Sequence, residues 1–429
     1  MKHVVLRDLL AESKDGEWGK GEAFPESVEM LVIRGTDFET VRLGDLGGVP
    51  IRFIPARIAQ RKTLQPLDLL IETAGGSKDR STGRTVLVTP ELLSRASLPV
   101  TCASFSRFLR IDPEKADPRF IFWLLQALYE GGQIRQYHTQ HTGVARFQFT
   151  TFADREPLSL PPLPIQRRVA SALSEYDDLI ENNTRRITIL EEMARALYRE
   201  WFLEFRFPGH EKVEMVESGD RSIPAGWTIE RTADAFDFCG GATPSTSEPT
   251  YWEGGAVVWY SPSDLTKAGT IFVAEGEKRI SEAGLGACSA RLFPPYSVMM
   301  TSRATLGVLA INTVEACTNQ GFITCIPNPR VTCPHLYLWL DASAAELEQL
   351  GTGATFKEIT KRAFREFPIL IAPEQIERAF HAKVWPLFQF IENLVAKNHN
   401  LRSTRDLLLP KLISGEVEIP LPTEDRSEP

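Results

Sequence analysis

Several features that would mark a chemical class are absent from this sequence of 429 residues. Its six cysteines form no CxxC pair and have no nearby histidine at zinc-ligand spacing, so we expect free buried thiols and no metal site. No apolar run approaches the roughly 18–20 residues of a membrane span, and the first residues lack the apolar core of a signal peptide. We therefore expect a cytoplasmic protein that makes no contact with a membrane.

Catalytic motifs are absent as well. The stretch GGSKDRSTG (75–83) has glycine and lysine but not the GxxxxGK[ST] spacing of a phosphate-binding loop. FPPY (293–296) is similar to the [DN]PPY of amino-methyltransferases, but Phe293 stands where a residue that holds the amine is needed. Asp68 and Glu72 suggest a nuclease carboxylate pair, yet the lysine that usually follows is missing. We expect a chain that is not an enzyme and binds no cofactor itself.

An excess of positive charge is also missing, since the formal net charge is −8. Residues 31–110 hold 12 basic against 7 acidic side chains, whereas residues 208–372 hold 13 against 19. Net charge does not describe individual faces, so a basic patch remains possible on either part.

A long apolar repeat is present at 164–205 and predicts one helix. Its apolar residues alternate in steps of four and three, which is typical of a coiled-coil seam. The series is Val169, Leu173, Tyr176, Ile180, Asn183, Ile187, Leu190, Ala194, Leu197 and Trp201. Asn183 is its one polar member.

A second long helix, at about 374–413, carries a similar seam. The series is Phe380, Val384, Leu387, Ile391, Leu394, Asn398, Leu401, Arg405, Leu408 and Leu412. We expect Pro386 to kink this helix or to delay its start.

Antiparallel pairing of the two seams places Val169 by Leu412, Trp201 by Phe380 and Asn183 by Asn398. A buried asparagine pair fixes the register of such a coiled coil at some cost in stability. The alternative is that each asparagine faces solvent or a helix end. Each seam spans 33 residues, or about 50 Å at about 1.5 Å per residue.

The order of elements repeats after about 210 residues. Each half has a strand-rich body, an aromatic-rich helix, a TG segment, an apolar strand and a long helix. The first aromatic-rich helix (118–138) is bounded by an Asp-Pro start and a Gly-Gly stop. We align TGVARF (142–147) with TGATF (352–356), and Pro164–Gln166 with Pro373–Gln375.

The predicted fold class is α+β: two similar mixed α/β domains, separated by two long helices that form an antiparallel coiled coil, in a pseudo-twofold internal repeat. The predicted segments are a first domain (1–158), a long helix (159–207), a second domain (208–372), a second long helix (373–415) and a polar tail (416–429).

Several motifs of this sequence resemble those of a known protein family. LPPLPIQRRVASAL…DDLIENNTRRITILEEMARALYREWF resembles the central conserved region of type I restriction–modification specificity subunits, and RDLLLPKLISGEVEI (405–419) resembles their distal conserved region. In the second domain, GGATPST, YWEGG, VWYSPSDL, TSRATLG, NQGF and GTGATFKEIT are similar to the family's target-recognition domain, in the same order. The first domain matches more loosely, through DLLIETAGGSKDRSTGR.

The resemblance implies a DNA-binding subunit that performs no chemistry. Each target-recognition domain would read one half of a bipartite site in double-stranded DNA, and the paired helices would set the unread spacer. The helices would also dock two methyltransferase subunits, and restriction translocase–nuclease subunits would complete the complex. S-adenosylmethionine, ATP and Mg²⁺ are then expected on those partners.

Three other interpretations remain open. One is the specificity subunit of a related system in which methylation and cleavage share one partner polypeptide. Another is a stand-alone DNA methyltransferase or nuclease, which the missing motifs disfavour. The third is a coiled-coil scaffold that binds proteins only.

Half-site readers need Arg, Lys, Asn or Gln at base edges and small polar groups at phosphates. Glycine-flanked polar loops at 75–84 and 240–247, with the segment 301–303, suit such contacts. The candidates are Gly76, Ser77, Lys78, Arg80, Arg84, Thr243, Ser245, Ser261, Thr301, Ser302, Arg303 and Gln320. For any one of them the alternative is an ordinary solvated surface role.

Overall fold

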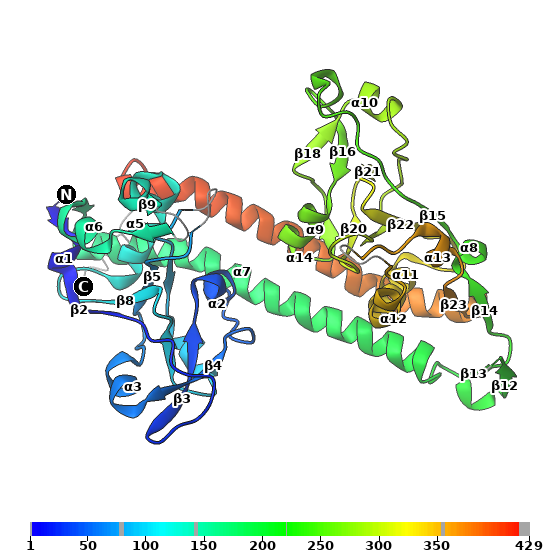
Figure 1. Ribbon diagram of the computed structural model, residues 1–429, viewed down its shortest axis with the longest axis horizontal. Helices are drawn as coiled ribbons and strands as arrows, with labels where there is room; N and C mark the ends of the chain where they lie inside the picture. The colour runs from blue at the N-terminus through cyan, green and yellow to red at the C-terminus, as the bar shows by residue number, and fades with distance from the viewer. Residues whose placement is uncertain (1, 77–80, 141–144, 220, 353–356, 420–429) are drawn as a thin grey trace, which may run out of the picture. The chain divides into compact units, whose positions relative to one another are not determined.

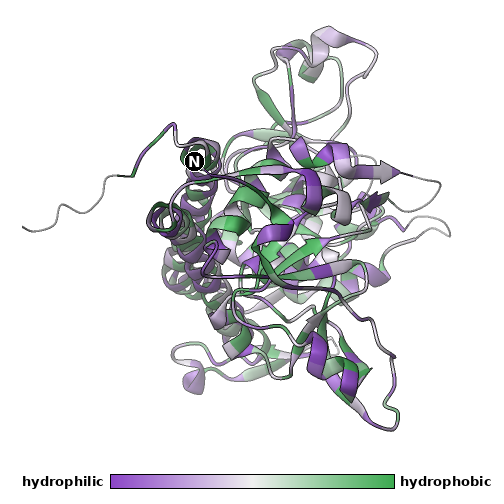
Figure 2. Cartoon of the chain, turned by 90° about the vertical axis from the view of Figure 1, so that its left-hand side faces the viewer, coloured by the Kyte–Doolittle hydropathy of each residue, from purple (hydrophilic) through white to green (hydrophobic). Residues whose placement is uncertain are grey.

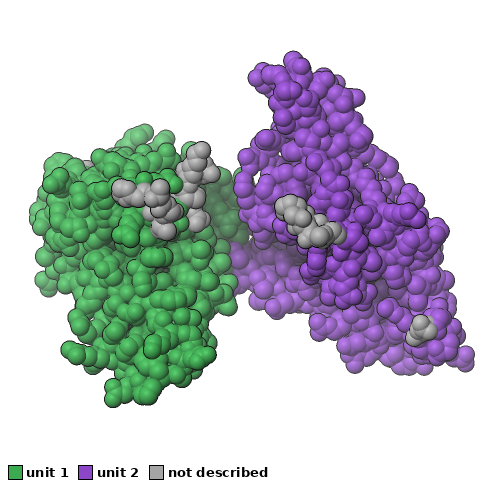
Figure 3. Space-filling view, in the orientation of Figure 1, with its two compact units in different colours: residues 1–182, 398–429 green, residues 183–397 purple. Residues whose placement is uncertain are grey.

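The computed structural model describes residues 2–76, 81–140, 145–219, 221–352 and 357–419. The chain forms two compact units, which Figure 3 colours separately. Unit 1 comprises residues 1–182 and 398–429, and unit 2 comprises residues 183–397. Each unit therefore contains a strand-rich body and a part of both long helices.

The long helices form where the apolar repeats predict them. Helix α7 spans Leu163–Tyr198 and continues into a π-helical turn at Arg199–Leu203. Helix α14 spans Glu374–Ser414 (Figure 1). Pro386 lies about three turns inside α14, so the expectation that it delays the start of the helix is wrong. The buried apolar face on both sides of the proline offsets the backbone hydrogen bond that it removes.

The helices pack antiparallel along the predicted seams. In unit 1, Val169 near the start of α7 shares a core cluster with Leu412 near the end of α14. In unit 2, the ring of Trp201 lies against that of Phe380, with centroids 5.6 Å apart. Figure 2 shows hydrophilic residues on the outer faces of the long helices.

Both seam asparagines are buried, Asn183 with 8% and Asn398 with 3% of its surface exposed. The alternative that they face solvent is therefore wrong. Asn398 Nδ2 donates to the backbone oxygen of Ile180 at 3.5 Å, which is long for a hydrogen bond. That Asn183 and Asn398 pair with each other stays a prediction.

Unit 1 is built on a four-stranded antiparallel sheet with the order β2-β8-β5-β6 and a three-stranded sheet with the order β4-β3-β7. Strand β3 pairs antiparallel with β4 and parallel with β7. Two short pairs, β1-β11 and β9-β10, complete the strands. The strands are β1 (Lys2–Val5), β2 (Leu10–Asp15), β3 (Ser27–Ile33), β4 (Ile51–Pro55), β5 (Leu69–Glu72), β6 (Thr85–Leu87), β7 (Val100–Cys102), β8 (Ser106–Ile111), β9 (His138–Gln140), β10 (Ala145–Phe147) and β11 (Pro157–Leu160). The shorter helices are α1 (Leu6–Leu9), α2 (Phe38–Arg42), α3 (Ala56–Lys62), α4 (Pro90–Arg95), α5 (Pro118–Glu130) and α6 (Phe149–Arg155).

Unit 2 repeats this topology. Its larger sheet has the order β15-β22-β19-β20-β17, and its three-stranded sheet has the order β18-β16-β21 with the same mixture of antiparallel and parallel pairs. The strands are β12 (Met215–Ser218), β13 (Arg221–Pro224), β14 (Thr228–Arg231), β15 (Asp237–Cys239), β16 (Val257–Tyr260), β17 (Phe272–Val273), β18 (Lys278–Ile280), β19 (Val298–Thr301), β20 (Leu309–Asn312), β21 (Ala316–Thr318), β22 (Phe322–Ile326) and β23 (Pro368–Ile371). The shorter helices are α8 (Thr232–Ala235), α9 (Pro262–Ala268), α10 (Glu282–Gly286), α11 (Cys333–Ala342), α12 (Ala344–Gln349) and α13 (Lys361–Arg365).

The aromatic-rich helix of each unit packs between the larger sheet and the long helices. Helix α5 begins where predicted, because the Asp117 side chain accepts a hydrogen bond from Phe120 N at 3.0 Å, and it ends before Gly131. In unit 1 one cluster joins Ile71 of the sheet, Trp123 of α5 and Leu173 of α7. The cluster in unit 2 joins the sheet, α11 and both long helices in the same way. Each large side chain buried there contributes about 1.5–3 kcal/mol.

The repeat is confirmed, but its alignment at the start of the long helices differs from the predicted one. Pro162 O accepts from Gln166 N in unit 1, and Pro373 O accepts from Glu377 N in unit 2. Pro162, rather than Pro164, is therefore the counterpart of Pro373. Gln166 and Glu377 then correspond, and each accepts a hydrogen bond from the backbone N–H at the start of the aromatic-rich helix.

Candidate nucleic-acid interface

In unit 2 the predicted loops meet at one edge of the sheets. Thr243 donates to Gln320 Oε1 at 2.7 Å, which joins the loop after β15 to the turn between β21 and β22. Ser302 N donates to Gly321 O at 2.8 Å, which joins the loop after β19 to the same turn. Thr243, Ser302 and Gln320, which are far apart in the sequence, are thus brought together.

Glycines allow this close approach. A Cβ on Gly241 would lie 1.8 Å from the backbone oxygen of Thr318, and a Cβ on Gly240 would lie 2.3 Å from Lys361 Nζ. A larger residue at position 241 would push the loop away from the backbone of the turn, whereas one at position 240 would displace the end of the Lys361 side chain. The motif GGATPST therefore brings Thr243 beside Gln320 because its first two residues have no side chains.

Arg303 is an exposed cation on this surface. Its guanidinium pairs with Glu358 at 2.8 Å, and the two side chains are 47% and 39% exposed. An ion pair this exposed contributes about 0–1 kcal/mol, so a phosphate or a base can replace Glu358 at small cost.

Three candidates in unit 2 support the loops: Thr301 and Ser302 are buried, and Ser261 is half-buried. Thr301 Oγ1 accepts from Val308 N at 2.9 Å. Ser261 N donates to Asp264 Oδ2 at 2.7 Å in the capping box of α9.

In unit 1, Arg84 is not exposed. Its guanidinium is buried between Glu72, with contacts of 2.8 and 3.0 Å, and the backbone oxygen of Gly35 at 2.6 Å. Burial lowers the pKa of Arg84, but the hydrogen bonds and charge of Glu72 outweigh it and hold that pKa above its ordinary value. Arg84 is therefore a structural residue and not a base reader, which corrects the expectation drawn from its loop.

The other candidates of unit 1 lie in the same loop. Ser77, Lys78 and Arg80 fall outside the described residues. Gly76 is half-buried at the edge of the described part of the loop.

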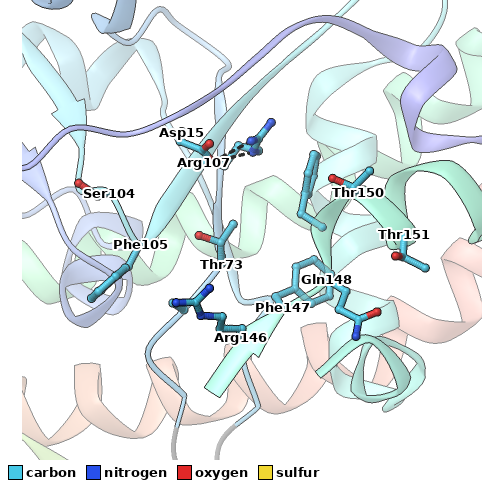
Figure 4. A pocket seen from close by; sticks show the side chains of 12 residues that line it. Asp15, Thr73, Ser104, Phe105, Arg107, Arg146, Phe147, Gln148, Thr150 and Thr151 are labelled. Atoms are coloured by element: carbon cyan, nitrogen blue, oxygen red, sulfur yellow. Dashed lines mark hydrogen bonds and ion pairs between the residues drawn. The ribbon is translucent and has the colours of Figure 1, made fainter. Parts of the chain in front are cut away.

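A pocket of about 510 Å³ opens in unit 1 next to Gly75 (Figure 4). It is lined by Asp15, Thr73, Ala74, Ser104, Phe105, Arg107, Arg146, Phe147, Gln148, Phe149, Thr150 and Thr151. These residues come from the end of β2, the loop after β5, the turn between β7 and β8, and the connection from β10 to α6.

This pocket and the loop cluster of unit 2 occupy the same place in the repeated topology. Four backbone hydrogen bonds of unit 1 have counterparts in unit 2. In unit 1 they run from Ala103 N to Ile33 O (2.9 Å), Thr73 N to Phe105 O (2.8 Å), Phe147 N to Thr73 O (2.9 Å) and Glu17 N to Cys102 O (2.8 Å). Their counterparts in unit 2, in the same order, run from Asn319 N to Tyr260 O (2.9 Å), Ser302 N to Gly321 O (2.8 Å), Ile359 N to Ser302 O (2.9 Å) and Ala242 N to Thr318 O (2.9 Å). We call these two surfaces the loop faces of unit 1 and unit 2.

Sequence reasoning missed Phe105 and Arg146 on the loop face of unit 1. Phe105 is 61% exposed, and Arg146 is exposed on β10. Neither lies in a glycine-flanked polar loop, the pattern that indicates candidate readers in the sequence. Their counterparts in unit 2 are Gly321, which follows the candidate Gln320, and Glu358, which pairs with the candidate Arg303. This correspondence is visible only once the backbone hydrogen bonds of the two units are aligned.

The residues that suggested a nuclease or a methyltransferase, Asp68, Glu72 and Phe293, have structural roles in the fold. Asp68 pairs with Arg110 at 2.8 Å, and Glu72 pairs with Arg84. Phe293 is buried, and the backbone oxygen of the following proline accepts from Asn312 Nδ2 at 2.8 Å. Among the described helices, none is long and apolar enough to cross a membrane.

The duplicated loop face agrees with comparisons to known proteins. The family model for the type I restriction modification DNA specificity domain matches residues 92–192 and again residues 224–394, which is more than half of the chain. The chain belongs to this family. It is a type I restriction–modification specificity subunit, a kind of subunit that recognises and does not catalyse, and the resemblance read from the sequence is confirmed.

Individual specificity subunits align over different lengths. The subunit of the MjaIX enzyme from Methanocaldococcus jannaschii is 34% identical over 194 residues, which is 44% of each chain. That of the HindI enzyme from Haemophilus influenzae is 24% identical over 375 residues, or 73% of this chain and 80% of the relative. The S subunit from M. genitalium has the same fold, with a TM-score of 0.58 and 17% identity over 96% of this chain and 95% of that one.

Proposed function

We propose that this specificity subunit reads a bipartite sequence in double-stranded DNA, with one loop face on each half. The observation that carries the proposal is that matching backbone hydrogen bonds build both loop faces. Two copies of one polar surface on a single chain suit two separate half-sites. Backbone N–H groups and small hydroxyls suit phosphates, whereas arginine and amide side chains suit base edges.

On the loop face of unit 2, the exposed candidates are Thr243, Ser245, Arg303 and Gln320. The amide of Gln320 matches the donor and acceptor of adenine in the major groove, and the guanidinium of Arg303 matches guanine or a phosphate. Gly76, Ser77, Lys78 and Arg80 remain the sequence-based candidates of unit 1. Thr301, Ser302 and Ser261 hold the loops in place.

The paired long helices would set the unread spacer and dock two methyltransferase subunits. In unit 2 the outer face of α7 exposes Ile189 and Met193, which are 56% and 48% exposed and one helical turn apart. Exposed apolar side chains on one face suit contact with another protein. S-adenosylmethionine would then be held by the methyltransferases, and ATP and Mg²⁺ would act on the partner subunits of the restriction complex.

The test is a selection of bound sites from random duplex DNA by the full chain assembled with its methyltransferase subunits. The expected result is two short fixed segments separated by a spacer of constant length and free sequence. A single continuous site, or no preferred sequence, would overturn the proposal. Mapping the methylated adenines of the host genome checks the same result in the cell.

A further inference from the structure

Phe105 presents an apolar ring on the loop face of unit 1. It lies in the turn between β7 and β8, where its backbone oxygen accepts from Thr73 N at 2.8 Å and from Ala74 N at 3.2 Å. The backbone is thereby fixed, while the side chain is 61% exposed. Aromatic residues and arginine are enriched in the cores of binding interfaces, so an exposed ring on a fixed turn suits contact with a ligand.

Arg146 flanks the same segment from the other side, because Ala74 and Arg146 form an isolated antiparallel bridge. The matching bridge in unit 2 joins Arg303 and Glu358, whose side chains form an ion pair. In unit 1 an alanine stands in place of that arginine and an arginine in place of that glutamate. Within the described part of the chain Arg146 makes no ion pair, so its charge is available to a ligand.

The second arginine of the pocket is already engaged. Arg107 pairs with Asp15 at 2.8 Å, drawn as a dashed line in Figure 4, and its guanidinium carbon lies 4.8 Å from the ring centroid of Phe149. The pocket thus offers one exposed ring, one available guanidinium, and polar groups such as Gln148 and Thr150 (Figure 4).

We propose that Phe105 and Arg146 are specificity-determining residues for the half-site read by unit 1, a proposal that rests on the function proposed above. Phe105 makes an apolar contact with a base, such as a thymine methyl group, and Arg146 donates two hydrogen bonds to a neighbouring guanine. Arg107 of this pocket is paired with Asp15, whereas the exposed Arg146 makes no ion pair among the described residues, so the pocket carries a cation that suits an anionic partner. Unit 2 has Gly321 and Glu358 at these positions and therefore reads its half-site without this pair.

The experiment repeats the random-site selection with Phe105→Ala and Arg146→Ala in the full chain, assembled with methyltransferase subunits. Each variant is expected to lose about 5- to 150-fold of discrimination at a base pair of one half-site, which is the usual effect of one mismatched pair. The other half-site and the spacer length should not change. Phe105→Leu, which keeps an apolar side chain, should retain part of the preference.

Two matched variants serve as controls. Ile51→Ala removes another exposed apolar side chain of unit 1, and Arg155→Ala removes another exposed arginine; neither residue lines the pocket. Both should select the wild-type site. Thermal melting of each variant shows whether it folds, and Phe105→Leu and Arg146→Gln repeat the test with smaller changes.

The outcomes separate this inference from the proposed function. If the wild-type complex selects two half-sites and the Phe105 and Arg146 variants select the same ones with equal preference, the inference is wrong and the function stands. If the variants lose methyltransferase binding with unchanged base preference, the pocket is a protein contact and the inference is again wrong. If the wild-type complex selects no sequence, the proposed function itself fails.

Discussion

Glu72 and Arg84 form a buried ion pair in unit 1, with side chains 3% and 9% exposed. This pair joins the end of strand β5, which carries Glu72, to the loop that carries Arg84. In the sequence the two residues stand 12 positions apart and suggest unrelated roles, a nuclease carboxylate and a DNA reader. Their pairing depends on the turn between them, which residue types alone do not specify.

Arg84→Ala is expected to lower the free energy of unfolding by about 3–5 kcal/mol, because it leaves the Glu72 carboxylate buried without a partner. Urea denaturation followed by circular dichroism measures the change. Arg84→Met combined with Glu72→Leu should cost less, since it removes both charges together. An Arg84→Ala variant as stable as the exposed control Arg155→Ala would contradict this account.

Glu377 gives unit 2 a pH-dependent term in its stability. Burial raises the pKa of this carboxyl, but His335 Nδ1 at 2.8 Å and donors from Thr332 at 2.8 and 3.0 Å outweigh burial and hold the pKa below its ordinary value of 4.5. A lowered carboxyl pKa in the folded state stabilises the protein above the unfolded-state pKa, and this stabilisation is lost as pH falls through the folded-state pKa.

Glu377→Gln, which places in unit 2 the residue type found at Gln166 in unit 1, should remove that term. The difference in unfolding free energy between wild type and variant should therefore shrink as pH falls below about 4.5. Denaturation at a series of pH values measures it. A difference that stays constant down to acidic pH would show that the carboxyl does not titrate as stated.

At the scale of elements, the long periodic segments were predictable and the short contacts were not. The seams of α7 and α14, the buried asparagines and the capped start of α5 follow from spacing and capping alone. The alignment of Pro162 with Pro373 does not, because it depends on which backbone carbonyl accepts the first hydrogen bond of each helix. The same limit hid Phe105 and Arg146, whose positions are set by pairing between distant strands.

If the antiparallel helix pair sets the unread spacer, as we propose, the length of the spacer depends on the length of the helices. Inserting four residues after Ile187 adds about 6 Å to α7, so it should lengthen the unread spacer by about two base pairs or abolish binding. Both half-site sequences should stay unchanged, because the loop faces are untouched. Methylome mapping or site selection reads the spacer directly.

A matched variant distinguishes loss of pairing from a longer spacer. Ile187 and Leu394 share one core cluster, so a second insertion of four residues after Leu394 lengthens both helices together. The double insertion should bind where the single insertion fails. A changed half-site sequence with the original spacer would refute the role of the helices.

At the scale of the whole molecule, the negative net charge limits how tightly this chain would bind DNA without partner subunits. Its formal net charge is −8, and residues 208–372 hold more acidic than basic side chains. Binding to the DNA backbone requires Lys and Arg to neutralise phosphates and release counterions. On the loop face of unit 2 the exposed Arg303 is paired with Glu358, which reduces its pull on a phosphate.

We therefore expect the isolated chain to bind its site much more weakly than the chain assembled with methyltransferase subunits, at one salt concentration. The log of affinity should also fall less steeply with log salt for the isolated chain, because fewer phosphates are neutralised. Fluorescence anisotropy on the selected duplex measures both quantities, and a duplex with scrambled half-sites is the control. Equal affinity and equal slope with and without the partners would show that this chain alone makes the phosphate contacts.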